Sequence, residues 1–235
     1  MSPAPRSPID IAPRVVAFDV NETLLDLRAL DPHFARAFGD AALRPQWFAQ
    51  MLQLAFTGGL TGVYVDFTAA QRRALRMLAQ RRGITIAEDD AMAITEQMST
   101  LPPHADAPPA LDKLARAGPT VVALTNSPKR VAEAQLRHAA IRDRFAHVFS
   151  ADEVHRLKPA PEPYHMVAER NGVTSGEVML VAAHAWDIAG ALAAGCRAAF
   201  VARPGAVLDP EGAQPEIVGS GLDEIAERIV VLARS

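Results

Sequence analysis

The sequence predicts an α/β fold in which helices cover both faces of a parallel sheet and a helical segment is inserted after the first strand. Short continuous apolar runs alternate with helical patterns along most of the chain. Such runs are typical of parallel strands buried on both faces, whereas strands with one wet face alternate between apolar and polar residues. Between residues 28 and 101, by contrast, apolar residues recur at helical spacing and no convincing strand is found.

The first predicted strand, residues 15–19, reads Val-Val-Ala-Phe-Asp and ends in the carboxylate of Asp19. The second strand is followed by the turn Asn126-Ser127-Pro128, and the fourth is preceded by a turn at Gly195. Both turns consist of residues that favour turns. In chain order the other predicted elements are a strand at 120–125, a helix at 129–140, a helix after Pro163, a strand at 178–183, a helix at 186–194, a strand at 196–202 and a helix at 222–233.

The domain organisation follows from this pattern. Residues 1–27 and 102–235 are predicted to form the α/β core domain, and residues 28–101 a helical cap domain inserted into it. Gly58-Gly59 and Gly62 interrupt the helical pattern of the cap, which predicts a bend there.

Composition narrows the possible functions. Of the 235 residues, 49% are hydrophobic, which is enough for a large core. The formal net charge is −3 and no basic tract stands out, so no nucleic-acid partner is expected. The single cysteine, Cys196, excludes an internal disulfide framework and fits a reducing compartment.

The N-terminal residues and the hydropathy of the chain predict a cytoplasmic protein. Residues 1–10 are rich in Pro and Ser and lack a long apolar core, so we expect a loose tail rather than a signal peptide. No apolar run approaches the roughly 20 residues that cross a bilayer, so no membrane partner is expected.

Polar residues gather directly after three of the predicted strands, at 19–23, 125–127 and 184–187. Because ligands of open α/β sheets bind at the carboxyl ends of the strands, we expect the three clusters to meet. A carboxylate that ends a strand, with the hydroxyl of Thr23 four residues after Asp19, is the arrangement of a nucleophilic aspartate. Taken alone, such an aspartate is more often a turn or helix cap. The prediction of a site therefore depends on the convergence of the clusters.

Four motifs occur in the order in which the haloacid dehalogenase (HAD) hydrolase superfamily carries them, and the chain resembles that superfamily from about residue 15 to residue 231. The motifs are Phe18-Asp19-x-x-x-Thr23-Leu24, Leu124-Thr125-Asn126, Lys158-Pro159 and Asp187. The chain is most similar to the type II 2-haloacid dehalogenase branch, on the evidence of Tyr164, Ala185-Trp186-Asp187 and Tyr64-Val65-Asp66-Phe67. The resemblance implies a Rossmann-like HAD core with an inserted helical cap.

The resemblance also implies a role for each motif residue. Asp19 is implied as the nucleophile, and Thr23 as the hydroxyl that orients its carboxylate. Lys158 is implied to keep Asp19 ionised, because a nearby cation lowers the pKa of a carboxylate. Asp187 would hold Lys158 or help to activate water, although its position also suits a helix cap. Tyr164 would contact Lys158 or the substrate, with simple packing as the alternative.

Two further motif residues, Thr125 and Asn126, are implied to contact the substrate. The Thr125 hydroxyl and its neighbouring backbone N–H groups can bind an anionic group, and the Asn126 amide can face a leaving group. The alternative for both residues is an ordinary turn and helix cap.

Two positions argue against phosphoryl transfer. Asn21 stands where HAD phosphatases carry a general-acid aspartate, and an amide cannot release a proton. Ala183 stands where they carry a magnesium-binding carboxylate. We therefore expect no metal and no other cofactor. The expected reaction is attack of Asp19 on C2 of a short 2-halocarboxylate with inversion, which gives an aspartyl ester that water opens to a 2-hydroxy acid, as in an (S)-2-haloacid dehalogenase.

The chain departs from the branch where the halide leaves. Phe48 stands in place of a halide-binding arginine, and Arg44, one helical turn earlier, is a candidate substitute. His184 stands in place of an asparagine and could act as a base, donate to the substrate or be structural. A small, apolar pocket is expected. The predicted substrate-binding residues are Asn21, Phe48, Leu52, Phe67, Thr125, Asn126, Tyr164 and Trp186.

Two alternatives stay open on the sequence. One is a HAD hydrolase of altered specificity, such as a weak magnesium-dependent phosphatase. The other is a non-catalytic binding protein that keeps the HAD fold, for which the missing arginine at Phe48 is the motive. Because members of the family often pair through cap and core surfaces, the resemblance also implies a homodimer.

Overall fold

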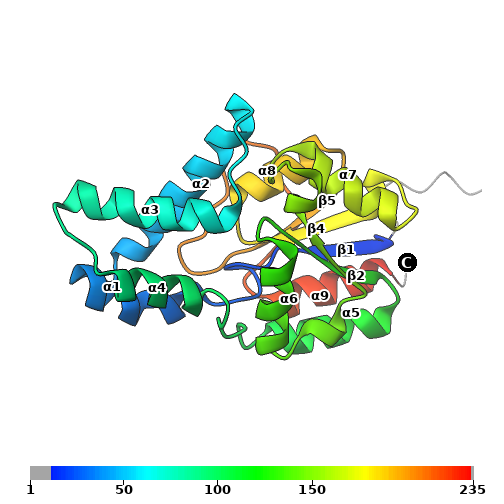
Figure 1. Cartoon of the computed structure of the whole chain (residues 1–235). Helices are drawn as coiled ribbons and strands as arrows, with labels where there is room; N and C mark the ends of the chain where they lie inside the picture. Colours follow the sequence, from blue (N-terminus) through cyan, green and yellow to red (C-terminus); the bar gives the residue numbers. More distant parts are fainter. Residues whose placement is uncertain (1–11, 234–235) are drawn as a thin grey trace, which may run out of the picture.

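A computed structural model describes residues 12–233, so the predicted tail at residues 1–10 lies outside the described part of the chain. Its centre is a parallel sheet with the strand order β3-β2-β1-β4-β5-β6 (Figure 1). The predicted α/β class and parallel sheet are confirmed. The strands are β1 (Val15–Phe18), β2 (Thr120–Thr125), β3 (His147–Ser150), β4 (Val178–Ala182), β5 (Arg197–Val201) and β6 (Ile217–Gly219).

The first strand lies in the middle of the sheet and determines where a ligand can bind. β1 pairs with β2 on one side and β4 on the other, with Phe18 opposite Ala123 and Val181. The backbone N–H of Asp19 still donates to the Val181 carbonyl oxygen at 3.0 Å. The strand order reverses at β1, and in open α/β sheets such a reversal leaves a crevice at the carboxyl ends of the strands. Asp19 is the first residue at that crevice.

Helices cover both faces of the sheet because the side chains of each strand alternate between the faces. Val15 and Ala17 join the apolar cluster on the face covered by α7 and α8. Val16 and Phe18 join the cluster on the opposite face, covered by α5, α6 and α9 (Figure 1). These helices are α5 (Ala107–Ala117), α6 (Lys129–His138), α7 (Pro161–Arg170), α8 (Ala185–Ala193) and α9 (Leu222–Leu232).

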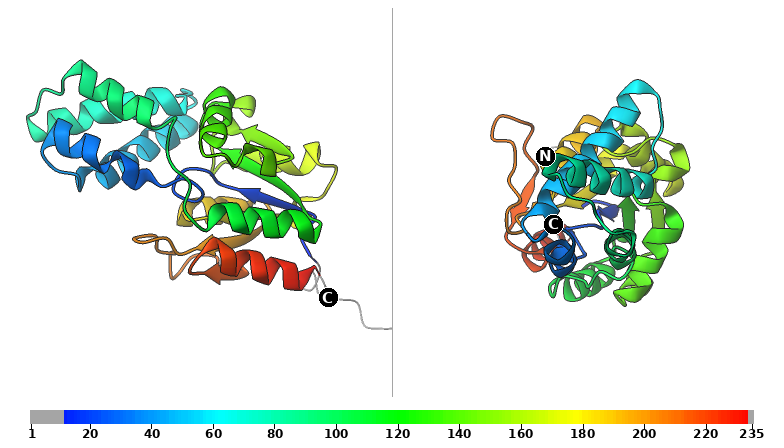
Figure 2. Two further views of the ribbon diagram at one scale, coloured as in Figure 1. Left: turned by 90° about the horizontal axis from the view of Figure 1, so that it is seen from below. Right: turned by 60° about the vertical axis from the view of Figure 1, so that its left-hand side comes forward.

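Four further helices form the cap and gather to one side of the sheet (Figure 2). They are α1 (Asp31–Phe38), α2 (Leu43–Thr61), α3 (Phe67–Arg82) and α4 (Glu88–Gln97). α3 illustrates their sequence logic: the Asp66 side chain accepts from the backbone N–H of Ala69 at its start, and Gly83 ends it in a left-handed conformation. Residues 28–101 contain no strand, as expected. The domain boundaries at 27/28 and 101/102 remain a prediction.

The bend predicted at Gly58-Gly59 and Gly62 occurs at Gly62 only. Gly58 and Gly59 lie inside α2, which runs on to Thr61. A Cβ atom at position 58 would lie 2.7 Å from the carbonyl oxygen of Val63. Gly58 therefore lets the chain after the helix pack closely against it, and Gly62, with a φ of 72°, ends the helix.

Two strands, helix α5 and four short 3-10 helices were not predicted. β3 and β6 lie at the two edges of the sheet and contain 4 and 3 residues. The 3-10 helices are η2 (Leu27–Leu30), η3 (Arg142–Arg144), η4 (Ala151–Val154) and η5 (Ser175–Glu177). No helix among the described residues is both long enough and apolar enough to cross a bilayer.

Candidate active site

Three buried charged side chains meet at the carboxyl end of β1. The ammonium group of Lys158 donates to Oδ1 of Asp19 at 2.9 Å and to Oδ2 of Asp187 at 2.5 Å. It also donates to the carbonyl oxygen of Leu124 at 3.0 Å. The side chains of Lys158 and Asp187 are fully buried, and that of Asp19 is 6% exposed. Sheet topology therefore brings together three residues that lie far apart in the sequence.

Lys158 balances the charges of the two carboxylates in this cluster. Burial alone would raise the pKa of Asp19, but Lys158 and His184 hold it well below its usual range. Burial opposes the charge on Lys158, but Asp187 and Asp19 raise its pKa. Burial raises the pKa of Asp187 against the opposing effect of Lys158. Asp19 is thus an anion at neutral pH, which is the form in which a carboxylate acts as a nucleophile.

A hydroxyl fixes the rotation of the Asp19 carboxylate. Oγ1 of Thr23 donates to Oδ2 of Asp19 at 2.8 Å and accepts from the backbone N–H of Ala183 at 2.9 Å. The predicted contact between Thr23 and Asp19 is present. Because Ala183 follows β4, the hydroxyl also ties the β1 loop to the neighbouring strand.

Tyr164 on α7 holds Asp187, not Lys158. Its hydroxyl donates to Oδ1 of Asp187 at 2.5 Å. Burial and Asp187 raise the pKa of Tyr164 well above its usual range, so the phenol stays a donor. Gly190 makes this arrangement possible, because a Cβ atom there would lie 2.6 Å from the Tyr164 hydroxyl and 2.6 Å from Cβ of Pro159.

His184 lies on the other side of the nucleophile and contacts two carboxylates. Its Nδ1 is 3.1 Å from Oδ2 of Asp19, and its Nε2 is 2.9 Å from Oε2 of Glu22. The ring stacks between Phe48 of α2, at a centroid distance of 5.7 Å, and Trp186 of α8, at 5.2 Å. Burial opposes a charge on the imidazole, but the hydrogen bonds to Asp19 and Glu22 raise its pKa to about 9. The ring is an imidazolium at neutral pH.

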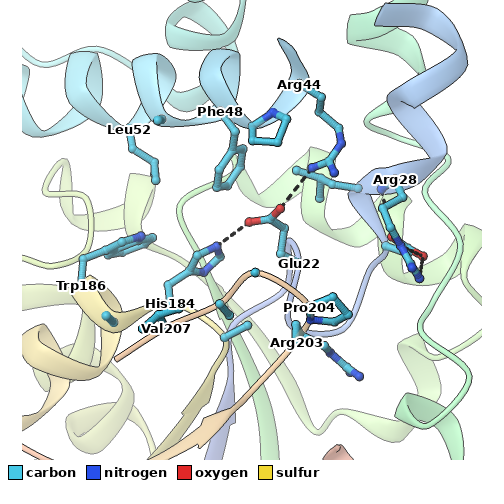
Figure 3. Close-up of a pocket in the computed structure, with 18 of the residues that line it drawn as sticks. Glu22, Arg28, Arg44, Phe48, Leu52, His184, Trp186, Arg203, Pro204 and Val207 are labelled. Carbon is cyan, nitrogen blue, oxygen red and sulfur yellow. Dashed lines mark hydrogen bonds and ion pairs between the residues drawn. The ribbon is translucent and has the colours of Figure 1, made fainter. Parts of the chain in front are cut away.

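Glu22 was missed on the sequence, where it is an unremarked residue of the turn after β1. Its Oε1 accepts from Nη1 of Arg44 at 3.3 Å, and Nε of Arg44 donates to Asp31 at 2.6 Å. Arg44 is therefore engaged with two carboxylates, and neither of them belongs to Asp19. Figure 3 shows Glu22 pointing toward His184 on one side and Arg44 on the other.

A cavity of about 420 Å³ opens beside His184 (Figure 3). The residues that define its character are the apolar Phe48, Leu52 and Trp186 and the charged Glu22, Arg44 and Arg203. Its lining is mainly apolar, as predicted, with the charged groups at a minority of positions, and its size is within the range that binds small organic molecules. Asp19 is not among its lining residues, whereas His184, which contacts the Asp19 carboxylate, does line it.

Five of the predicted substrate-binding residues do not line this cavity: Tyr164, which binds Asp187, and the four described next. Asn21 donates to Ser127 and accepts from Gln135 in a buried polar network. Oγ1 of Thr125 accepts from the Ser127 backbone, as in an ordinary turn. The Asn126 side chain bonds to both backbone groups of Lys158, so it shapes that loop. Phe67 is buried in the apolar cluster that includes the cap helices. Thr125 and Asn126 hydrogen-bond to backbone groups and do not reach the cavity, as is common for short polar side chains at strand ends.

Two of the side chains that contact the Asp19 carboxylate, Lys158 and His184, are cations. Oδ1 of Asp19 and Oδ2 of Asp187 both accept from the single ammonium group of Lys158. Within residues 12–233, no group of three or more His, Cys, Asp or Glu side chains is placed to hold a metal ion. The group that balances the carboxylate charge here is an ammonium on the protein itself.

Comparison with known proteins agrees with this geometry. Residues 13–195 match the family model of the haloacid dehalogenase-like hydrolases. The chain is 28% identical to (S)-2-haloacid dehalogenase 2 of Pseudomonas sp. strain CBS-3, over 90% of this chain and 93% of that protein. It is 31% identical to (S)-2-haloacid dehalogenase 4A of Burkholderia cepacia, over 76% of this chain and 78% of that protein. The structure of L-2-haloacid dehalogenase from Xanthobacter autotrophicus aligns with a TM-score of 0.85 and 26% identity, covering 92% of this chain and 98% of that one.

Proposed function

Since this chain belongs to the haloacid dehalogenase-like hydrolase family, we propose that it hydrolyses the carbon–halogen bond of short (S)-2-haloalkanoic acids to give 2-hydroxy acids. The observation that carries this proposal is the buried Asp19 carboxylate, held as an anion by Lys158 and oriented by Thr23 at the carboxyl end of the central strand. A desolvated carboxylate of fixed geometry is suited to attack carbon directly.

The first step is a displacement at C2. An oxygen of Asp19 forms a bond to C2 while the carbon–halogen bond breaks, and the halide leaves with the bonding electron pair. The product is an ester between Asp19 and the substrate, with inversion at C2. No proton has to be delivered to a halide, which suits a site where Asn21 stands at the position of the phosphatase acid.

The leaving halide needs a positive charge nearby, and His184 can supply it. The imidazolium stacks on Phe48, the residue that occupies the position of the halide-binding arginine in similar dehalogenases. Arg44, the substitute considered on the sequence, is instead bound to Glu22 and Asp31. A cation in a site that largely excludes water stabilises developing negative charge far more than it would in water.

Substrate entry requires His184 to part from Asp19. His184 lines the cavity and contacts the carboxylate, whereas Asp19 does not line the cavity, so we expect C2 to reach the nucleophile when the contact between Nδ1 and Asp19 opens. The bond to Glu22 can persist during this movement and keep the imidazolium at the site. The substrate carboxylate then replaces part of the negative charge that His184 loses.

The proposal extends to assembly, location and domain organisation. The resemblance supports a homodimer, and the single buried Cys196 supports a cytoplasmic location. The division into a core domain at 1–27 and 102–235 and a cap domain at 28–101 is retained as a proposal.

The proposal is tested by halide release from both enantiomers of 2-chloropropionate and from chloro-, bromo- and fluoroacetate. Release is expected from the (S) enantiomer, unchanged by EDTA and absent in Asp19→Asn. An exposed aspartate in α4 offers a matched control, and Asp89→Asn should keep full activity. Turnover of an aryl phosphate that requires magnesium, with no halide release, would overturn the proposal in favour of a phosphatase.

A further inference from the structure

His184 links the nucleophile to a second carboxylate that has no place in the displacement step. The imidazole reaches Oδ2 of Asp19 through Nδ1 and Oε2 of Glu22 through Nε2, at 3.1 and 2.9 Å. Both ring nitrogens are thus engaged by oxygen acceptors, and two aromatic rings hold the ring plane. A histidine fixed at one nitrogen by a carboxylate presents its other nitrogen for proton transfer.

Glu22 is held in place to make this contact. Its φ of 62° lies in the left-handed region, which is uncommon for residues other than glycine and is kept only where the surroundings enforce it. Its backbone N–H donates to the Leu25 carbonyl oxygen at 2.9 Å, and its own carbonyl oxygen is 3.1 Å from Nε2 of His104. Arg44 binds its second carboxylate oxygen. Backbone and side chain are both constrained.

The other candidate base is already engaged. Asp187 is fully buried, with Oδ2 bound to Lys158 and Oδ1 bound to the Tyr164 hydroxyl. It does not line the cavity, from which water must come. His184 lines the cavity and lies within hydrogen-bond distance of Asp19. A water approaching the ester carbonyl carbon of Asp19 from the cavity would therefore meet the imidazole first.

The charge around His184 changes during the reaction. Before the displacement, the ring lies between the carboxylates of Asp19 and Glu22. Esterification removes the charge of Asp19, and burial then favours the neutral imidazole more strongly. The other titratable groups near the ring are Lys158 beyond Asp19, Arg44 beyond Glu22, and Asp26, Arg28, His104 and Arg203 along the cavity wall. None of these cations contacts the imidazole.

We propose that His184 is the general base that hydrolyses the aspartyl ester and that Glu22 is the residue that positions it. This assignment rests on the proposed function, since it needs the ester at Asp19. The loss of the Asp19 charge converts His184 from a cation that stabilises the leaving halide into a base for the second half of the reaction.

Hydrolysis of the ester requires two proton transfers through His184. After the halide departs, the imidazolium releases one proton to solvent, which is the proton of the overall hydrolysis. Nδ1 takes a proton from water while the hydroxide oxygen bonds to Cγ of Asp19. The bond between Cγ and the ester oxygen breaks, and the departing alkoxide takes the proton back from His184 to become the 2-hydroxy acid. The proton left on the Asp19 carboxyl group returns to the imidazole and restores the starting state.

The test follows the ester directly. Enzyme is mixed with (S)-2-bromopropionate and quenched with acid at short times, and the peptide that contains Asp19 is measured by mass spectrometry alongside released bromide. In His184→Gln, whose amide can bond to Glu22 but cannot take up a proton, ester breakdown should slow about 100-fold or more, so that ester accumulates. His138→Asn, at an exposed position of α6, is the matched control and should behave as wild type.

Glu22→Gln supplies a readout that a purely structural role would not move. The rate of ester breakdown should rise with pH to a plateau, and removing the Glu22 charge should shift its midpoint about one pH unit or more lower. The inference is overturned if either variant breaks down the ester with the wild-type rate and midpoint, or if both variants fail to form ester at all. Failure of the proposed function looks different, because wild-type enzyme itself would then form no ester at Asp19.

Discussion

Phe48 and His184 stack nearly face to face, with ring centroids 5.7 Å apart and an interplanar angle of 21°. Phe48 belongs to cap helix α2 and His184 to the loop after core strand β4, so the contact joins the two parts of the chain directly at the site. In similar dehalogenases the position of Phe48 carries a positive charge. Here the charge lies on the neighbouring core residue, and the cap contributes the flat surface that orients it.

Removing this surface should weaken the halide step more than the fold. Phe48→Leu is expected to lower the rate of halide release about fivefold to tenfold, because an aromatic pair contributes about 1 kcal/mol beyond its buried area. Stopped-flow detection of halide gives the rate. Phe38, stacked on Phe34 at 5.6 Å in the cap, is the matched control, and Phe38→Leu should reduce stability without reducing the rate. If Phe48→Leu and Phe38→Leu release halide at the same rate, Phe48 has no specific role in the halide step.

Halide release should depend on pH through His184. Because the pKa of His184 is raised to about 9, the imidazolium is present at neutral pH and is lost as the pH rises through about 9. The first-turnover rate of halide release should therefore fall over that range. The same raised pKa means that the stabilisation from His184 is complete below its unfolded value of 6.5 and is lost on the alkaline side. His184→Gln should show no such fall, and a wild-type rate that stays level to pH 10 would contradict the assigned charge.

Removing Lys158 should destabilise the protein strongly. Lys158→Met leaves the buried carboxylates of Asp19 and Asp187 without their cation, which is expected to cost about 3–5 kcal/mol in the free energy of unfolding. Because the pKa of Asp19 is lowered in the folded protein, its stabilisation is present at neutral pH and lost toward acid, and this dependence should weaken in the variant. Urea denaturation at several pH values measures both effects.

The exposed pair between Lys113 and Glu227 provides the comparison for that variant. Lys113→Met should cost less than about 1 kcal/mol, because exposed ion pairs contribute little. If Lys158→Met and Lys113→Met lower the free energy of unfolding by similar amounts, Lys158 does not stabilise the buried carboxylates as proposed.

Gly190 is expected to tolerate no side chain. Gly190→Ala places a Cβ atom 2.6 Å from both Pro159 and the Tyr164 hydroxyl, so α8 or α7 must shift and Asp187 with them. Both stability and halide release should decline. Gly59→Ala is the matched control, because a Cβ atom there meets nothing within 4 Å, and it should stabilise α2 by about 0.5–1 kcal/mol. Wild-type activity in Gly190→Ala would mean that the contact with Tyr164 does not position Asp187.

Much of the architecture was predictable because the strands that build the site have strong local signals. β1, β2 and β4 are continuous apolar runs, and each is followed by polar residues that parallel topology brings to one end of the sheet. The contacts of Asp19 with Thr23 and Lys158 agree with the prediction. β3 and β6 were missed because short edge strands have little periodicity to detect.

The parts of the site that escaped prediction depend on geometry that has no local signature. Glu22 reaches His184 only because its backbone adopts a left-handed turn, which the sequence does not reveal for a glutamate. Asn21 lies one position earlier and turns into the core toward Gln135. Arg203 enters the cavity wall from a loop after β5, held by two bonds to Asp106. Such partners lie many tens of residues apart in the sequence, so motif spacing alone cannot predict that they are in contact.

A covalent bond between Asp19 and substrate carbon determines where the oxygen atom of water is incorporated, so isotope labelling tests for it. Excess enzyme is allowed a single turnover of (S)-2-chloropropionate in water labelled with heavy oxygen, and product and the Asp19 peptide are weighed separately. An ester intermediate predicts an unlabelled 2-hydroxy acid and heavy oxygen in the Asp19 carboxylate. A labelled product with an unlabelled Asp19 would mean that water attacks the substrate directly, and it would contradict the account.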